Sequence, residues 1–212
     1  MRRGLIGFLM VMALLIATAA PTVEAHEASG TFLDVPAYAQ QRNLSCEYAA
    51  LTIATGAFGY AVSEWEFDHR VGWSDNPHWG YRGDIYGWWG NTTDYGVYPE
   101  ALVPALDEFG FYGETFYAQG DRSELIARLD WGMPTLVWLG FWGDTGYYES
   151  TEDGTPYKLA AGMHVVVAYG YDDWGVYVSD PASGDYTSYA WGDFMWMWNV
   201  LDGMALAVAP YS

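Results

Sequence analysis

The chain has 212 residues, of which 27 are acidic and only 8 basic, and its formal net charge is −19. Charged residues make up 17%, below the roughly 25% of an average chain, so the acidity reflects a shortage of lysine and arginine. An apolar content of 51% excludes a disordered acidic tail, and the negative charge argues against nucleic-acid binding. The single cysteine excludes an internal disulfide and a multi-cysteine metal site.

Residues 1–25 have the pattern of a secretory signal peptide. Arg2 and Arg3 precede an apolar run, and small residues up to Ala25 offer a cleavage site. The run is also close to the length of a retained membrane anchor, which is the alternative. We expect cleavage, which leaves residues 26–212 as one secreted or extracytoplasmic domain without stable membrane insertion.

The first half of this domain has helical patterns. Ser45 is a suitable N-cap and Glu47 suits a first turn, so a helix is predicted to begin at Cys46 and end near residue 57. Further helices are expected at residues 62–68, 99–109 and 121–129, the last opened by a capping box at Asp121.

The second half has short runs rich in valine, leucine and aromatic residues, which are typical of strands. These runs are residues 135–139, 163–169, 175–179 and 204–209. Helices followed by strands predict an α+β fold with the helices packed on an antiparallel sheet.

Cys46 is a candidate nucleophile because of its place at a helix N-terminus. The helix dipole and the free N–H groups there favour the thiolate, whereas the adjacent Glu47 acts against it. The alternative is a buried structural cysteine, because free cysteine is among the most buried residue types.

His164 and Asp180 are the candidate partners of this thiol. Residues 171–175 indicate a turn between two strands, and pairing symmetric about residue 172 would place His164 opposite Asp180. A register shift of two makes the pair diagonal on the same face, and a shift of one separates the pair. The alternatives are a core histidine and an aspartate that only begins an Asp-Pro turn.

Gln40 lies six residues before Cys46 and is a candidate oxyanion donor. Its side-chain amide and the Cys46 N–H could stabilise the oxyanion of acyl transfer. A glutamine in a loop is otherwise ordinary polar surface.

These segments resemble those of papain-like peptidases in cysteine peptidase family 39, which includes bacteriocin-processing peptidase domains. The likeness rests on residues 33–51 around the cysteine and on residues 162–184 around the histidine and aspartate. The resemblance implies a papain-like cysteine peptidase fold, with Cys46 as nucleophile, His164 as base, Asp180 orienting the base and Gln40 as oxyanion donor. It also implies a peptide or protein substrate and no cofactor or metal. Bacteriocin-processing members usually have Gly-Pro after the cysteine, whereas Glu47 and Tyr48 stand here, so leader cleavage does not follow.

We therefore expect a secreted papain-like thiol hydrolase acting on peptide or amide bonds, with transglutaminase-like amide exchange as a variant of the same chemistry. The alternative is a catalytically silent surface or wall-binding module that uses the Trp- and Tyr-rich residues 72–95. Those aromatic residues are expected to pack as a lid over the core, or else to line a groove for a glycan or peptide. The same stretch holds oxygen- and nitrogen-bearing side chains that give a weak signal for a cation: Asp75, His78, Asp84 and Asp94.

Overall fold

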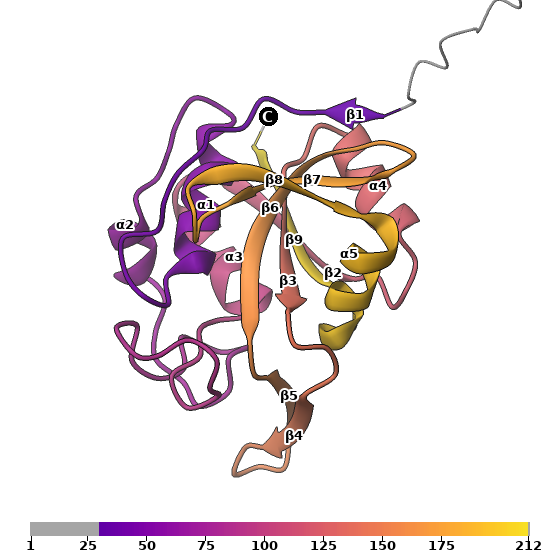
Figure 1. The fold of residues 1–212 in the computed structure, drawn as a ribbon. Coiled ribbons are helices and arrows are strands. Elements are labelled where there is room, and N and C mark those ends of the chain that lie inside the picture. The colour runs from indigo at the N-terminus through magenta and orange to yellow at the C-terminus, as the bar shows by residue number, and fades with distance from the viewer. Residues whose placement is uncertain (1–29, 212) are drawn as a thin grey trace, which may run out of the picture.

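An antiparallel seven-stranded sheet organises the protein (Figure 1). The computed structural model describes residues 30–211, so the predicted signal segment, residues 1–25, lies outside the described residues. Strand order in the sheet is β2-β9-β3-β6-β7-β8, and β1 pairs with β6. The strands are β1 Thr31–Phe32, β2 Phe111–Tyr117, β3 Thr135–Gly140, β6 Met163–Tyr171, β7 Gly175–Asp180, β8 Asp185–Ala190 and β9 Met204–Pro210.

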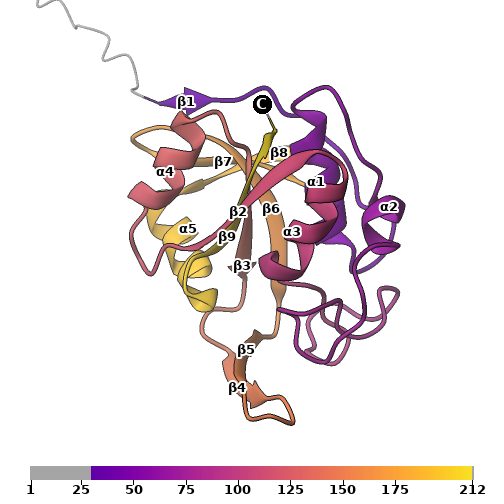
Figure 2. The same ribbon diagram turned by 180° about the vertical axis from the view of Figure 1, so that it is seen from behind.

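Helices cover both faces of this sheet, as Figures 1 and 2 show from opposite sides. The first three helices pack on one face, and the last two pack on the other. The helices are α1 Cys46–Gly56, α2 Glu64–Asp68, α3 Pro99–Glu108, α4 Ser123–Asp130 and α5 Trp191–Trp198, with a 3-10 turn at Asn199–Leu201.

Strand alternation explains why both faces are covered. Along β3, Leu136 and Trp138 point into the core with α1 and α3, while Val137 and Leu139 point into the core with α4 and α5. A strand that is apolar on both faces must be buried on both. The α+β class is therefore confirmed, with a sheet enclosed between two helical layers.

The expectation that helices precede strands is wrong in detail. β2 precedes α4, and α5 lies between β8 and β9. The predicted capping box is also wrong, because Asp121 accepts a hydrogen bond from the Ser123 N–H, two residues on, in a turn before the helix. Within residues 30–211 no helix is long and apolar enough to cross a membrane.

A separate hairpin projects from the end of β3 and β6 (Figure 1). It consists of β4 Gly146–Ser150 and β5 Pro156–Ala160. The Trp- and Tyr-rich residues 72–95 lie nearby. Some of their rings are buried and others are exposed, so the expectation that they pack as a lid over the core is only partly right. Tyr81 and Tyr95 are buried, but the four tryptophans of this aromatic stretch are exposed: Trp73, Trp79, Trp88 and Trp89.

Candidate active site

Cys46 is the first residue of α1, and only 6% of its surface is exposed. The helix begins here because the Ser45 carbonyl accepts the first helical hydrogen bond, from the Ala49 N–H. The predicted side-chain cap does not form: the Ser45 hydroxyl donates to the Arg42 carbonyl and accepts from the Arg42 N–H. The Glu47 N–H in the first turn is directed at the Cys46 sulfur.

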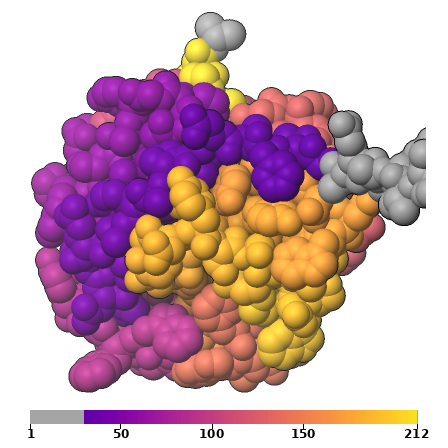
Figure 3. Space-filling model, turned by 45° about the horizontal axis from the view of Figure 1, so that its top comes forward, coloured from indigo at the N-terminus to yellow at the C-terminus, as the bar shows by residue number. Residues whose placement is uncertain are grey.

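The segment before this helix lies along the β7–β8 hairpin, where Figure 3 shows its indigo surface against orange and yellow strands. The Gln40 N–H donates to the Pro181 carbonyl at 2.8 Å, and the Ser179 hydroxyl donates to the Pro36 carbonyl at 3.0 Å. These bonds bring Gln40 beside the residue that follows Asp180. A loop and a hairpin far apart in sequence are thereby joined.

His164 and Asp180 come from adjacent strands, and His164 Nε2 lies 2.7 Å from Asp180 Oδ1. The two residues do not pair directly opposite each other. Val167 pairs with Ser179, so the continued register sets Asp180 opposite Val166 and diagonal to His164. Burial acts to raise the pKa of Asp180, but its hydrogen bond with His164 prevails and holds that pKa below its usual value.

A β-bulge places the two side chains on one face. Next to the turn the register is offset by one residue, and the offset changes between Ala168 and Gly170. If the register next to the turn continued along both strands without the bulge, His164 and Asp180 would lie on opposite faces of the sheet. The bulge adds one residue to β6 and returns both to the same face.

All four predicted site residues line a single pocket of about 310 Å³. His164 Nε2 is occupied by Asp180, so the other ring nitrogen, Nδ1, remains for the thiol. The walls of the pocket are mainly apolar and aromatic. The lining comprises Gln40, Asn43, Leu44, Cys46, Trp89, Tyr95, Phe141, Met163, His164, Asp180 and Ala182.

The thiol itself is bonded elsewhere in this structure. Cys46 Sγ donates to Glu47 Oε2 at 3.4 Å. Burial and the neighbouring Glu47 charge raise the pKa of the Cys46 thiol well above its usual value, although the Val165 N–H acts in the opposite direction. Of the two interpretations left open by the sequence, the buried cysteine describes Cys46 in this conformation, because desolvation exceeds the effect of the helix terminus.

Gln40 lines the pocket with both donor positions of its amide in use. Its Nε2 donates to the Arg42 carbonyl and to the Asn43 carbonyl, both at 2.8 Å. Its Oε1 is buried and has no hydrogen-bond partner among the described residues. In this conformation the Gln40 side chain therefore holds its own loop together. It must give up its hydrogen bond to one of these two carbonyls before its amide can donate to an oxyanion.

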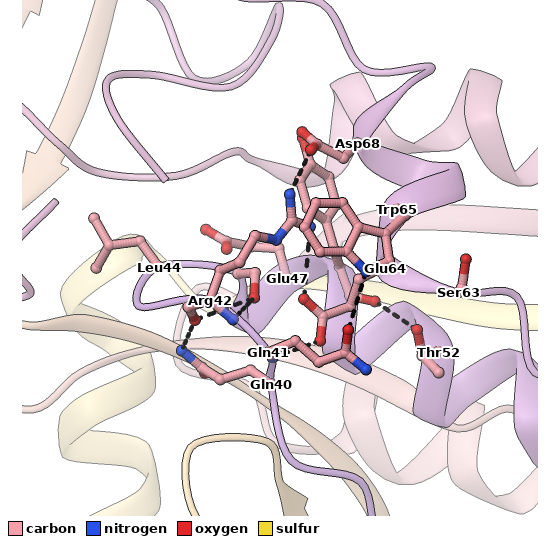
Figure 4. Close-up of polar contacts among 12 residues, drawn as sticks. Gln40, Gln41, Arg42, Leu44, Glu47, Thr52, Ser63, Glu64, Trp65 and Asp68 are labelled. Carbon is pink, nitrogen blue, oxygen red and sulfur yellow. Dashed lines mark hydrogen bonds and ion pairs between the residues drawn. The ribbon is translucent and has the colours of Figure 1, made fainter. Parts of the chain in front are cut away.

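Arg42 is a site-supporting residue that sequence reasoning missed, and Figure 4 shows its surroundings. Arg42 as a whole is 4% exposed, and its guanidinium pairs with Asp68 and lies 3.6 Å from the fully buried Glu64. It also lies over the Trp65 ring at 4.2 Å. Glu64 accepts from the Gln41 N–H as well, so α2 fixes the loop that carries Gln40.

The aromatic stretch contributes a second support. Trp89 Nε1 donates to the Met163 carbonyl at 2.7 Å, next to His164 on β6. The Phe141 ring lies 5.5 Å from the His164 ring and 6.4 Å from that of Trp89. Exposed aromatic residues in a glycine-rich loop were the available signal, but their partners on β6 were not visible in sequence.

The weak cation signal is not supported. In the part of the chain that the structure describes, no group of three or more His, Cys, Asp or Glu side chains is placed to hold a metal ion. His78 is bonded to Glu100, and Asp94 accepts from the Asp84 N–H, so these residues serve local structure.

Solved structures share this fold. A Bacillus anthracis protein described as a C39-like peptidase superposes with a TM-score of 0.73 at 22% identity, covering 86% of this chain and 98% of that one. A double glycine motif protease from an AMS/PCAT transporter, in complex with a leader peptide, gives 0.55 at 15% identity, with 85% and 95% covered. No curated protein matches the sequence.

The family model described as Peptidase_C39 like family matches residues 32–206, which include all four predicted site residues. A match over most of the chain agrees with the α+β fold and with a pocket that holds a cysteine and a histidine–aspartate pair. The chain is a cysteine peptidase-type domain and belongs to the Peptidase_C39 like family.

Proposed function

We propose that the protein is a thiol hydrolase that cleaves peptide or amide bonds with Cys46 as nucleophile and His164 as base. The observation that carries the proposal is the shared pocket, in which Cys46, His164, Asp180 and Gln40 meet from separate segments. A thiol beside an imidazole that is oriented by a carboxylate is the arrangement needed for acyl transfer. A peptide substrate suits this chemistry.

The reaction begins when the Cys46 side chain rotates from Glu47 toward His164 Nδ1 and transfers its proton to the ring. The thiolate adds to the substrate carbonyl, and the C–N bond breaks as His164 protonates the leaving amine. Water then gives a proton to His164 and attacks the thioester, which releases the acid and restores the thiol. Asp180 keeps the ring oriented and stabilises the imidazolium.

The oxyanion would be held by the Cys46 N–H and the Gln40 amide. Gln40 can supply this donor by releasing the Asn43 carbonyl, while its bond to the Arg42 carbonyl keeps the side chain in place. Loss of one oxyanion donor typically lowers kcat by about 10²-fold to 10³-fold. Gln40→Ala should therefore reduce turnover while leaving alkylation of Cys46 unaffected.

The test is cleavage of a denatured-protein or peptide library followed by mass spectrometry. Wild-type protein should produce new termini, and Cys46→Ala and His164→Ala should not. Cys46→Ser is the matched control for packing, because it keeps the side chain's size while removing the thiol. Cleavage that persists in Cys46→Ala would refute the proposal.

A binding module without catalysis is the second candidate. It is favoured by the neutral, buried thiol and by the exposed Trp73 and Trp88, which are 68% and 86% exposed. It predicts that Cys46→Ala binds cell-wall glycan or peptide as well as wild type, with no substrate consumed by either. Amide exchange is a third outcome of the same assay, recognised by incorporation of an added primary amine.

We also propose that the protein acts outside the cytoplasm. The support is the signal-like pattern of residues 1–25. N-terminal sequencing of protein recovered from the culture medium should begin near residue 26, and a product retained in the membrane with Met1 present would refute cleavage.

A further inference from the structure

Glu47 is a buried carboxyl that touches the nucleophile and has no part in the reaction described above. It follows Cys46 in α1 and is completely buried. Its Oε2 accepts from the Cys46 thiol at 3.4 Å, and its Oε1 accepts from the Val97 N–H at 3.1 Å. Both carboxyl oxygens therefore have fixed partners.

The chain provides a fitted seat for this carboxyl. Gly96 has a φ of +135°, and a Cβ there would lie 2.0 Å from Glu47 Oε1, so only glycine permits the approach. The next residue, Val97, donates its N–H to Glu47 and accepts at its carbonyl from Trp138 Nε1 at 3.0 Å. The seat is thus held from the loop and from β3.

No positive charge compensates Glu47 within residues 30–211. None of the ion pairs among these residues involves Glu47, and two of the arginines pair with other carboxylates, Arg42 with Glu64 and Asp68, and Arg82 with Glu149. Burial raises the pKa of Glu47 to about 7. The titratable groups around it are the Cys46 thiol on its own helix, His164 across the pocket on β6, and the phenols of Tyr48, Tyr81, Tyr95 and Tyr98.

The sulfur experiences two opposing influences. The N–H groups of Val165 and Glu47 are directed at it and favour a thiolate, while the Glu47 carboxylate disfavours one. A like charge near an ionisable group shifts the balance toward the neutral form. Burial is the largest cause that raises the pKa of the thiol, and the Glu47 carboxylate adds to it, so the charge of this carboxyl is the part of the balance that changes with pH.

We propose that Glu47 gates the nucleophile: its carboxylate holds Cys46 as a neutral thiol, and uptake of one proton by Glu47 releases the sulfur to His164. This rests on the proposed function only in naming His164 as the acceptor. In the released state, Glu47 has gained a proton from solvent and the thiol proton has moved to His164. A thiolate–imidazolium pair then stands beside a neutral carboxyl, and the site as a whole has gained one proton.

The experiment measures the rate of iodoacetamide alkylation as a function of pH. Cys46 is the only cysteine, so mass spectrometry reports that site alone. We compare wild type with Glu47→Gln, which keeps the shape and removes the charge, and with Glu47→Asp, which keeps a titrating carboxyl. Glu100→Gln is the matched control, because that carboxylate contacts His78 and Tyr117 instead of the sulfur.

Wild-type alkylation of the released thiolate should fall as pH rises, with a midpoint near the Glu47 pKa of about 7. Glu47→Gln should move this midpoint to higher pH and raise the alkylation rate roughly tenfold at about pH 8, one unit above the wild-type midpoint. Glu47→Asp should stay closer to wild type, and Glu100→Gln should match it. An unchanged midpoint in Glu47→Gln, or no alkylation in either protein, would overturn the gate. Normal gating without peptide cleavage would instead refute only the hydrolase, because alkylation requires no turnover.

Discussion

Replacing Glu47 with glutamine is expected to stabilise the protein at and above neutral pH. The Glu47 pKa is about 7 in the fold, against an ordinary value of 4.5, because the carboxyl is completely buried. As pH rises from about 4.5 to about 7, the unfolded chain gives up this proton before the folded one does, and stability falls. The difference corresponds to about 3 kcal/mol of unfolding free energy.

Urea denaturation at a series of pH values measures this effect. The quantity to compare is the unfolding free energy of Glu47→Gln minus that of wild type at each pH. This difference should increase by about 3 kcal/mol between acid and neutral pH and then level off. Other groups, such as Asp180 with its lowered pKa, are present in both proteins and cancel in the difference.

The assignment is tested by how this free-energy difference changes with pH, and not by its absolute value, because the amide also changes local hydrogen bonding by an amount that does not depend on pH. Glutamine can still accept from the Val97 N–H, so the seat remains occupied. A difference that stays constant from acid to neutral pH would refute the assignment of Glu47 as an uncompensated buried charge. The Glu100→Gln control should show no such rise, since the Glu100 pKa is lowered instead of raised.

Three further substitutions test the supports of the site. Asp180→Asn should lower kcat by roughly 10²-fold to 10⁴-fold in a peptide-cleavage assay, because the His164 ring loses its orienting carboxylate; unchanged kcat would show that Asp180 has no such role. Arg42→Ala should reduce the unfolding free energy by about 3–5 kcal/mol, since Glu64 stays buried without its cation. Thermal unfolding followed by circular dichroism measures this loss. The double variant Arg42→Ala with Glu64→Gln should recover part of the lost stability, because it no longer buries an unpaired carboxylate. Gly96→Ala should cost about 1–3 kcal/mol of stability from strain at its positive φ, and it should shift the alkylation midpoint by displacing the Glu47 carboxyl; a wild-type midpoint would mean that the seat adapts.

Local signals in the sequence were sufficient to predict the helix that carries Cys46 and the two strands that carry His164 and Asp180. Residues 46–57 were expected as a helix, and α1 runs from Cys46 to Gly56. The expected strands at residues 163–169 and 175–179 correspond to β6 and β7. Apolar runs bounded by turn residues are strong signals, because their burial does not depend on details of register.

α5 was not predicted, for a physical reason. Its sequence is rich in tryptophan, phenylalanine and methionine, which suit strands as well as helices. The helix forms because Trp191, Phe194 and Trp198 recur at helical spacing and pack against the sheet. β8 was not predicted either. It is an edge strand of polar and partly exposed residues, so its sequence shows no clear alternation of apolar and polar positions.

The thiol's surroundings lay beyond sequence reasoning because they depend on desolvation. The position of Cys46 at a helix N-terminus indicated a thiolate, and Glu47 was identified as an opposing charge. Neither observation shows that both side chains are buried or that Gly96 seats the carboxyl. Burial determines the sign of the pKa change, and burial belongs to the tertiary structure.

The register of the β6–β7 hairpin shows how one residue decides whether the site can exist. A count from the turn cannot distinguish facing, diagonal and separated arrangements of His164 and Asp180, because register shifts of only one or two residues convert one arrangement into another. The structure resolves this with the bulge that ends at Gly170, where β1 also pairs and the Phe32 ring lies against the glycine backbone. A glycine inside a strand pattern is itself a signal for a bulge or a close approach. Gly170 was therefore the residue from which the diagonal pairing of His164 and Asp180 could have been anticipated.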